Sequence, residues 1–181
     1  LAGSPTVDRV VYAAAWGGYF TADKSAFGVC MRGHYYIGDT CLERPEGADA
    51  AFGLLETQVA RLIAAGKRVT LVLGLPSGPG FSKGGEAVRT RSVLLIFQGF
   101  KLPQTVSRAK VEEQLRFTNR RLMDVANRTG AAIIDPMNCL CPDGDCPTTG
   151  HIDSGHLGAK FVRASVRFMD ETVTDATLPE Q

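Results

Sequence analysis

Three short apolar runs, separated by longer amphipathic stretches, constrain the fold of this chain more than any other feature. The runs lie within residues 8–15, 69–73 and 131–134. Continuous apolar runs of this length are typical of strands that are covered on both faces, as in parallel sheets. Parallel neighbours need a crossover connection, which is usually a helix. The alternation therefore predicts an α/β fold with a mainly parallel sheet.

Apolar residues at helical spacing predict three helices. Asp49 is the expected N-cap of the first helix, and Gly66 is its expected stop. The second helix is expected over 105–129, before Gly130, and the third is expected to extend to Met169. The apolar positions that mark the helices are Phe52, Leu55, Val59, Leu62 and Ile63; Val111, Leu115, Leu122, Val125 and Ala126; and Leu157, Phe161, Ala164, Phe168 and Met169.

The composition is that of an ordinary globular protein. Apolar residues make up 44% of the 181 positions and charged residues 22%, and the formal net charge is +1. Composition therefore indicates neither nucleic acid nor an anionic membrane as a partner. Without repeats or a linker, residues 1–181 are predicted to form one domain, with a flexible tail over 173–181. The chain opens without an initiator Met and soon reaches an apolar run, so we expect the C-terminal portion of a longer polypeptide.

Five cysteines point to an oxidising compartment such as the periplasm. Cys30 and Cys41 flank a Tyr- and Gly-containing segment that could form a hairpin, and we expect both to be in a disulfide. Cys141 and Cys146 are expected to form another disulfide, which would close the turn Pro-Asp-Gly-Asp. The count is odd, and a cysteine in upstream sequence would explain it.

Two metal alternatives exist near the last three cysteines. Three thiolates and an imidazole would complete a structural zinc site, although Cys-x-Cys spacing is unusual for zinc. The side chains concerned are Cys139, Cys141, Cys146 and His151. Asp143 and Asp145 resemble part of a calcium loop, but the remaining oxygen ligands are missing. The disulfide is favoured, and neither a metal nor a cofactor is expected.

The segment from His151 to Phe161 carries the most chemistry. Asp153 and His156 lie three residues apart, where a loop is predicted to become a helix. A neutral imidazole can accept a proton near pH 7, and a carboxylate can hold that imidazole in the required tautomer. The pair would supply the base and the acid of a serine-hydrolase triad. In the structural alternative, Asp153 caps the helix and His156 is a solvated residue of its first turn.

A nucleophile is not evident in the chain. In α/β hydrolases the nucleophilic serine lies on a sharp turn between a strand and a helix. The candidate serines lack that context and are typical turn formers instead. They are Ser4, Ser25, Ser77 and Ser82.

In open α/β sheets, ligands bind beyond the carboxyl ends of the strands. Trp16, Pro76 and Asp135 follow the three predicted strands and therefore mark that edge. Trp16 and Tyr19 could line a sugar- or acyl-binding cleft there, or they could belong to the core. Both alternatives are open from the sequence.

Four segments of the chain form a recognisable series. They are, in order, Val10–Trp16; Leu62–Val69 with Leu75-Pro76; Asp135-Pro136 followed by Leu140–Cys146; and Asp153–Leu157, which reads Asp-Ser-Gly-His-Leu. In this order they resemble the SGNH-hydrolase superfamily, and most closely the SGNH domains fused behind the membrane acyltransferase-3 domain of bacterial O-acyltransferases. The resemblance extends roughly from Asp8 to Met169.

The resemblance implies a three-layer α/β/α fold of the SGNH or flavodoxin-like type that lacks its first strand and helix. It makes His156 the catalytic base and Asp153 the acid that orients it. The superfamily's Gly-Asp-Ser nucleophile segment would lie upstream of this chain. Its Gly-x-Asn oxyanion motif is not visible in the chain. At that place the chain has Ala15-Trp16-Gly17-Gly18, and the close relatives also tend to carry Trp there.

The function that the resemblance implies is O-acyl transfer, such as O-acetyl transfer, to a cell-surface polysaccharide, or removal of the acyl group. The expected partners are an acyl donor, the glycan and an upstream membrane acyltransferase domain in the same polypeptide, which would tether a periplasmic domain to the inner membrane. The alternative is a non-catalytic glycan-binding module on a degenerate SGNH fold, in which Trp16 matters and His156 is dispensable.

Overall fold

A computed structural model describes residues 1–16, 36–37, 40–41, 46–81, 105–153 and 155–172. The chain forms two compact units. Unit 1 comprises residues 1–74, 115–135 and 171–181, and unit 2 comprises residues 75–114 and 136–170. Several residues named from the sequence lie outside the described residues, and so does the side chain of Cys41. They are Tyr19, Ser25, Cys30, Ser82 and the tail over 173–181.

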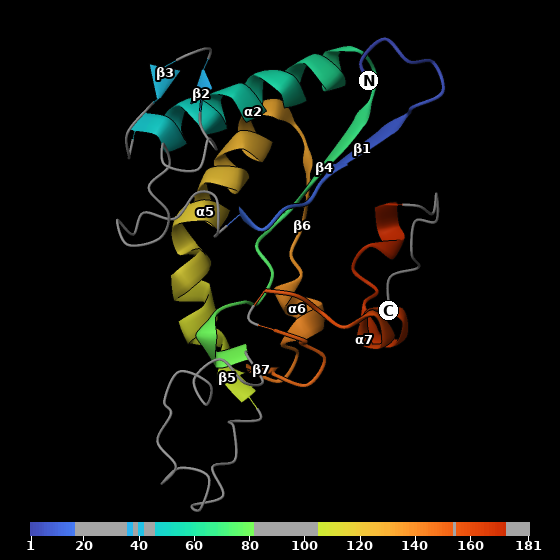
Figure 1. Cartoon of the computed structure of the whole chain (residues 1–181). Helices are drawn as coiled ribbons and strands as arrows, with labels where there is room; N and C mark the ends of the chain where they lie inside the picture. The colour runs from blue at the N-terminus through green and yellow to red at the C-terminus, as the bar shows by residue number, and fades with distance from the viewer. Residues whose placement is uncertain (17–35, 38–39, 42–45, 82–104, 154, 173–181) are drawn as a thin grey trace, which may run out of the picture. The chain divides into compact units, whose positions relative to one another are not determined.

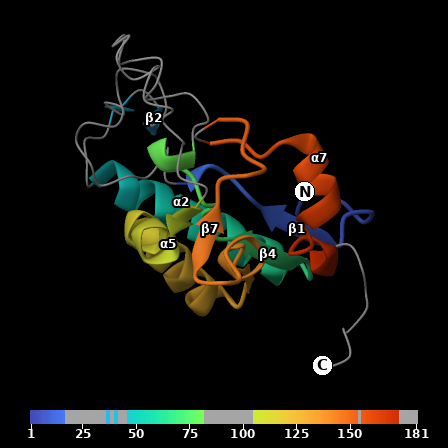
Figure 2. The ribbon, with the colours of Figure 1, turned by 90° about the horizontal axis from the view of Figure 1, so that it is seen from below.

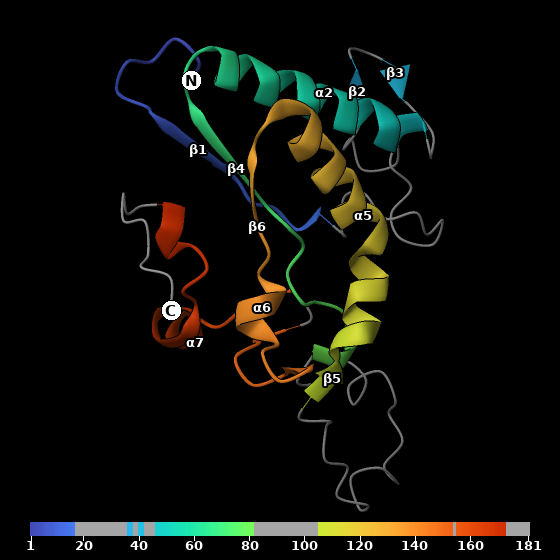
Figure 3. The same ribbon diagram turned by 180° about the vertical axis from the view of Figure 1, so that it is seen from behind.

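Unit 1 is built on a three-stranded parallel sheet. Its strands are β1 (Arg9–Tyr12), β4 (Arg68–Val72) and β6 (Ala132–Ile134), in the order β1-β4-β6. Figure 3 shows the three strands side by side. Tyr12 is opposite Leu71, and Leu71 is opposite Ile133. The predicted α/β class with a mainly parallel sheet is confirmed, although β1 ends at Tyr12, earlier than the apolar run suggests.

Two helices cover one face of this sheet. They are α2 (Glu46–Ala64) and the part of α5 (Arg108–Thr129) that belongs to unit 1 (Figure 1). Alternate residues of a strand point to the same face of the sheet. The residues of β4 that contact the helices therefore identify the face that the helices cover. The buried core contains three alternate residues of β4 and its extension together with residues from both helices. These are Val69, Leu71 and Leu73; Phe52, Val59 and Leu62; and Leu122, Val125 and Ala126.

The two predicted glycine stops are confirmed, but the predicted start of α2 was wrong. Gly66 and Gly130 have φ angles of 75° and 80°, the left-handed conformation that ends helices at glycine. Asp49 is not an N-cap, because α2 already begins at Glu46. The Asp49 carboxylate instead forms an ion pair with Arg121 of α5 at 2.7 Å.

Unit 2 contains shorter elements. Strands β5 (Thr105–Ser107) and β7 (Asp145–Pro147) pair antiparallel, α6 spans Met137–Leu140, and a 3-10 helix spans Pro79–Phe81. The chain then runs from β7 through residues 148–158 to α7 (Ala159–Ser165), as Figure 2 shows. Two further described elements do not belong to unit 2 alone. Strands β2 (Tyr36–Ile37) and β3 (Thr40–Cys41) pair antiparallel in unit 1, and a 3-10 helix at Asp170–Thr172 lies where the chain passes from unit 2 to unit 1.

Two sequence predictions for unit 2 were wrong at their boundaries. Residues 105–107 were expected to begin the second helix but form β5, because Thr and Val favour strands and β7 provides a pairing partner. The third helix was expected to reach Met169 but ends at Ser165, where the following Val166 is extended. None of the described helices is long and apolar enough to cross a membrane.

A disulfide closes the segment between α6 and β7. It joins Cys141 and Cys146, the pair that the sequence favours, and both residues are buried. Arg108, at the start of α5, donates to the Cys141 carbonyl oxygen at 3.3 Å and to Asn138 Oδ1 at 3.1 Å. The zinc alternative does not describe this structure, because two of its four proposed ligands are joined to each other. Cys139 is half-buried on α6.

Candidate acid–base site

The turn formed by Asp153 to His156 in unit 2 is closed by its own hydrogen bonds. Asp153 Oδ1 accepts hydrogen bonds from the backbone N–H of Gly155 at 2.8 Å and of His156 at 2.9 Å. An aspartate that binds backbone amides two and three residues ahead is typical of an Asx turn. The carboxylate is therefore fixed by the backbone of its own short segment.

The same carboxylate faces the imidazole. His156 Nδ1 lies 2.9 Å from Asp153 Oδ1 and 2.8 Å from Oδ2. A carboxylate can only accept, so a neutral His156 carries its hydrogen on Nδ1 and leaves Nε2 as the proton acceptor. The side chains are 76% exposed for His156 and 51% exposed for Asp153, so a reacting group can reach them. This is the arrangement of a base and the acid that orients it.

The electrostatics keep the acid charged. The backbone N–H of Gly155, and after it the His156 ring, hold the pKa of Asp153 below its ordinary value. Hydrogen bonds to the ionised form favour that form. Asp153 is therefore a carboxylate at neutral pH, and it can stabilise a positive charge that develops on His156.

The helix-capping alternative for Asp153 was wrong, and so was the expected place of His156 in the first turn of the helix, although His156 is exposed to solvent as that alternative expected. Helix α7 begins at Ala159, its N-cap is Gly158, and no side chain caps it. Asp153 lies five residues before that cap and uses its oxygens on its own turn. His156 precedes the helix instead of lying in its first turn.

A narrow backbone clamp holds the two ends of the turn together. His151 and Leu157 form an isolated antiparallel bridge, and Ile152 N–H donates to the His156 carbonyl oxygen at 2.9 Å. Gly158 N–H donates to the Gly150 carbonyl oxygen at 2.6 Å. Gly150 has a φ angle of 105°, and a Cβ there would lie 2.5 Å from the Phe161 ring. Only glycine fits at this end of the clamp.

Trp16 was expected either to line a sugar- or acyl-binding cleft or to belong to the core, and in the structure it belongs to the core. Its side chain is 6% exposed and packs in the core of unit 1. The indole N–H donates to the Val72 carbonyl oxygen at 2.7 Å. A ring covered in this way does not offer a stacking face to a sugar. The structure therefore favours packing over ligand binding for this residue.

The described candidate serines lie in loops. Ser4 hydrogen-bonds Thr6 at 3.1 Å near the start of the chain. Ser77 is half-buried between β4 and the 3-10 helix, with no helix of α type directly after it. Neither has the context of a nucleophile elbow.

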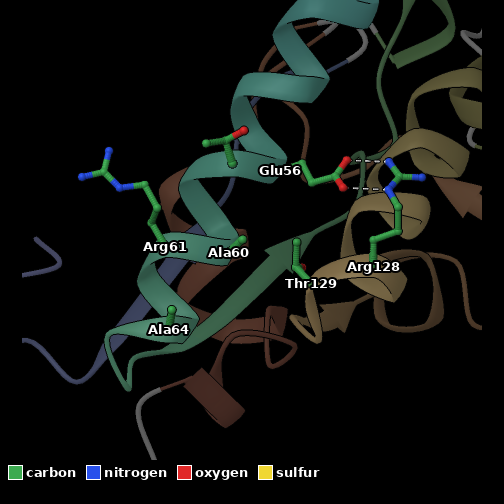
Figure 4. Close-up of a pocket in the computed structure, with 7 residues that line it drawn as sticks. Glu56, Ala60, Arg61, Ala64, Arg128 and Thr129 are labelled. Carbon is green, nitrogen blue, oxygen red and sulfur yellow. Dashed lines mark hydrogen bonds and ion pairs between the residues drawn. The ribbon is translucent and has the colours of Figure 1, made fainter.

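A surface hollow of about 500 Å³ lies between α2 and α5 in unit 1. None of its lining residues is a site residue predicted from the sequence. Figure 4 shows Glu56 and Arg128 facing one another across it, while Arg61 points away from this pair. Arg128 donates to both Glu56 oxygens, at 2.9 and 2.8 Å. The main charges of the hollow thus satisfy each other. Between these two described places, the candidate site is the Asp153–His156 turn, because there a carboxylate faces an exposed imidazole.

Comparison with known protein families identifies the family of this chain. A family model described as "SGNH domain (fused to AT3 domains)" matches residues 1–169. The chain belongs to this family. The resemblance drawn from four sequence segments is thereby confirmed, and the chain is a domain of the SGNH hydrolase and acyltransferase type. No curated protein and no solved structure matches the chain.

His151 has a buried contact that the sequence did not reveal. From the sequence, the one role considered for its side chain was that of a zinc ligand, yet the residue is 4% exposed and its imidazole hydrogen-bonds the Pro76 carbonyl oxygen. Its position next to the Asp-x-x-His segment was the available signal. The contact itself joins residues 75 positions apart, which no local pattern reveals.

Proposed function

We propose that this SGNH domain supplies the base and the orienting acid for O-acyl transfer to, or removal from, a cell-surface polysaccharide in the periplasm. The observation that carries the proposal is the His156 Nδ1 contact of 2.8 Å with the Asp153 carboxylate, in a turn that leaves the imidazole exposed. The acyl group of the proposal is acetyl. The nucleophile would come from an upstream Gly-Asp-Ser segment, as the resemblance to the superfamily implies.

The reaction would follow the serine-hydrolase scheme. His156 Nε2 takes the hydroxyl proton of the serine while the serine oxygen attacks the ester carbonyl carbon. The imidazolium, stabilised by Asp153, then protonates the leaving alcohol, and an acyl-serine remains. A sugar hydroxyl or water then gives its proton to His156 Nε2 while its oxygen attacks the acyl-serine carbonyl carbon. The bond to the serine oxygen breaks, His156 returns the proton to that oxygen, and the acylated sugar or the free acid leaves.

Several observations support the setting. SGNH domains of this family are fused to AT3 domains, so a membrane acyltransferase domain in the same polypeptide is the proposed partner and tether. The Cys141–Cys146 disulfide is typical of an oxidising compartment such as the periplasm. The family match includes segments of both units, which supports the proposal that they form one SGNH domain.

The test uses the protein extended upstream to include the Gly-Asp-Ser segment. We expect hydrolysis of an acetyl ester, and a loss of kcat on the order of 10³-fold or more in His156→Ala, because the base and its orienting acid act as a unit. Lys160→Ala, an exposed change on α7 close by, is the control and should keep full activity. If His156→Ala is as active as the extended wild type, the proposal fails.

A further inference from the structure

The side chain of His151 is buried against a neighbouring loop of unit 2. Its Nε2 lies 3.1 Å from the Pro76 carbonyl oxygen, and its ring lies 4.4 Å from the Phe81 ring at an angle of 36°. A carbonyl oxygen only accepts, so Nε2 carries the hydrogen and donates it. The imidazole thus makes a directed polar contact and an aromatic contact with the same loop.

The loop that receives His151 is itself firmly held. Phe81 is 1% exposed and ends a 3-10 helix, where its N–H donates to the Gly78 carbonyl oxygen at 3.0 Å. Gly80 packs so closely on Val106 of β5 that a Cβ on Gly80 would lie 2.9 Å from a Val106 methyl carbon. His151 is therefore attached to a part of unit 2 with little room to move.

The backbone of His151 belongs to the clamp that closes the acid–base turn. His151 bridges Leu157, and the next residue, Ile152, donates to the His156 carbonyl oxygen at 2.9 Å. A shift of the His151 side chain would therefore shift the backbone on both sides of Asp153 and His156. Among the described residues of this turn, His151 is the nearly fully buried polar side chain that reaches the Pro76–Phe81 loop.

We propose that His151 is a positioning residue, whose contacts with Pro76 and Phe81 hold the Asp153–His156 turn in the geometry in which the carboxylate faces Nδ1. It acts through the backbone and does not touch the reacting atoms. The inference deepens the proposed function, on which its activity readout rests. Its structural readout, the hydrogen position on His156, does not depend on catalysis.

The first experiment measures the tautomer of His156 by ¹⁵N NMR of the ring nitrogens in the 181-residue chain. The chain has only three histidines, which makes assignment by substitution direct. In the wild type we expect His156 in the Nδ1–H form that Asp153 selects. Asp153→Ala is the positive control and should abolish that preference, while Lys160→Ala should leave it unchanged.

Three variants separate the contacts of His151. His151→Phe keeps an aromatic ring but cannot donate to Pro76, and we expect His156 to become a mixture of tautomers. His151→Gln places an amide donor near the position of Nε2, and we expect it to restore the Nδ1–H form. Phe81→Leu removes the aromatic contact from the other partner and should act in the same direction as His151→Phe. If folded His151→Phe and Phe81→Leu both keep the wild-type tautomer, the inference is overturned.

The second experiment uses the active, upstream-extended protein. We expect His151→Phe to lower kcat by about ten- to a hundred-fold with KM nearly unchanged, because a small misplacement of a catalytic group has effects of this size. His151→Gln should recover most of kcat. Unchanged kcat in His151→Phe overturns the inference. An inactive extended wild type counts against the proposed function alone, and the tautomer measurement still decides the role of His151.

Discussion

Each of the two units of this chain is stabilised internally by a different kind of interaction. In unit 1, residues far apart in the sequence meet in one apolar core between a parallel sheet and two helices. In the described part of unit 2, a disulfide, a glycine clamp and single polar contacts connect short segments. The comparison teaches that the apolar core and the acid–base turn have separate physical supports. A change can therefore weaken one and leave the other intact.

The largest effect is expected from a cavity in unit 1. Leu71 is fully buried at the centre of the sheet, and Leu71→Ala should lower the free energy of unfolding by about 2–5 kcal/mol. Leu54→Ala on α2 is the matched control, because Leu54 is 50% exposed and little apolar area is lost. Denaturant unfolding measures both. Similar losses for the two variants would contradict the assignment of the core.

The next effect is expected at the clamp in unit 2. Gly150→Ala combines a positive φ angle with an overlap against Phe161, and should cost about 2–4 kcal/mol. Gly144→Ala is the control, since Gly144 has a φ angle of 87° but nothing within 4 Å of the added Cβ, so only about 1 kcal/mol of strain applies. Equal destabilisation in thermal unfolding would show that the Phe161 contact is unimportant.

Removal of the disulfide is expected to have a slightly smaller effect, which is confined to unit 2. Cys141 and Cys146 are five positions apart, and closing so short a loop stabilises by about 2 kcal/mol. In the double variant Cys141→Ser/Cys146→Ser, hydrogen exchange should increase in unit 2 near α6 and β7. The amides of β4 in unit 1 should keep their protection. Loss of protection in both units to the same extent would mean that they unfold as one.

The smallest effect is a dependence on pH. Hydrogen bonds from Gly155 and then His156 lower the pKa of Asp153, whereas a hydrogen bond from Arg128 lowers the pKa of Glu56 in unit 1. A carboxyl with a lowered pKa in the folded state stabilises above its unfolded pKa, and this is lost as the pH falls through its folded pKa.

The wild type should therefore have a higher free energy of unfolding than Asp153→Ala. This difference should have its full size above about pH 4 and should shrink at lower pH. Thermal unfolding from pH 7 to pH 3 measures it, and Glu56→Ala provides the corresponding measurement for unit 1. Amide exchange should place the first effect at Gly155 and His156 and the second on α2 and α5. A difference for Asp153→Ala that stays constant over this range would contradict an ionised Asp153 held by hydrogen bonds.

The sequence predicted those parts of the molecule that local patterns determine. Apolar periodicity located the parallel strands, and Gly66 and Gly130 located the ends of two helices. The approach of Asp153 to His156 follows from a spacing of three residues within one turn, which a local pattern can reveal.

The features that were missed depend on distant partners. Asp49 pairs with Arg121 instead of capping its helix, and β5 exists because β7 lies beside it. The contact of His151 with Pro76 is of the same kind. At such places the partner that decides the local structure is distant in sequence, so a local pattern cannot reveal it.

The hydrogen bonds that join the acid to the base lie within the four residues from Asp153 to His156. Both side chains are therefore carried, already in contact, by one short segment of the chain. In the proposed mechanism, the triad then needs only one further alignment, that of the serine with His156 Nε2, whereas a triad of three dispersed residues needs two. A single short deletion would remove both groups at once, whereas a change to the proposed serine segment would leave the contact between Asp153 and His156 intact.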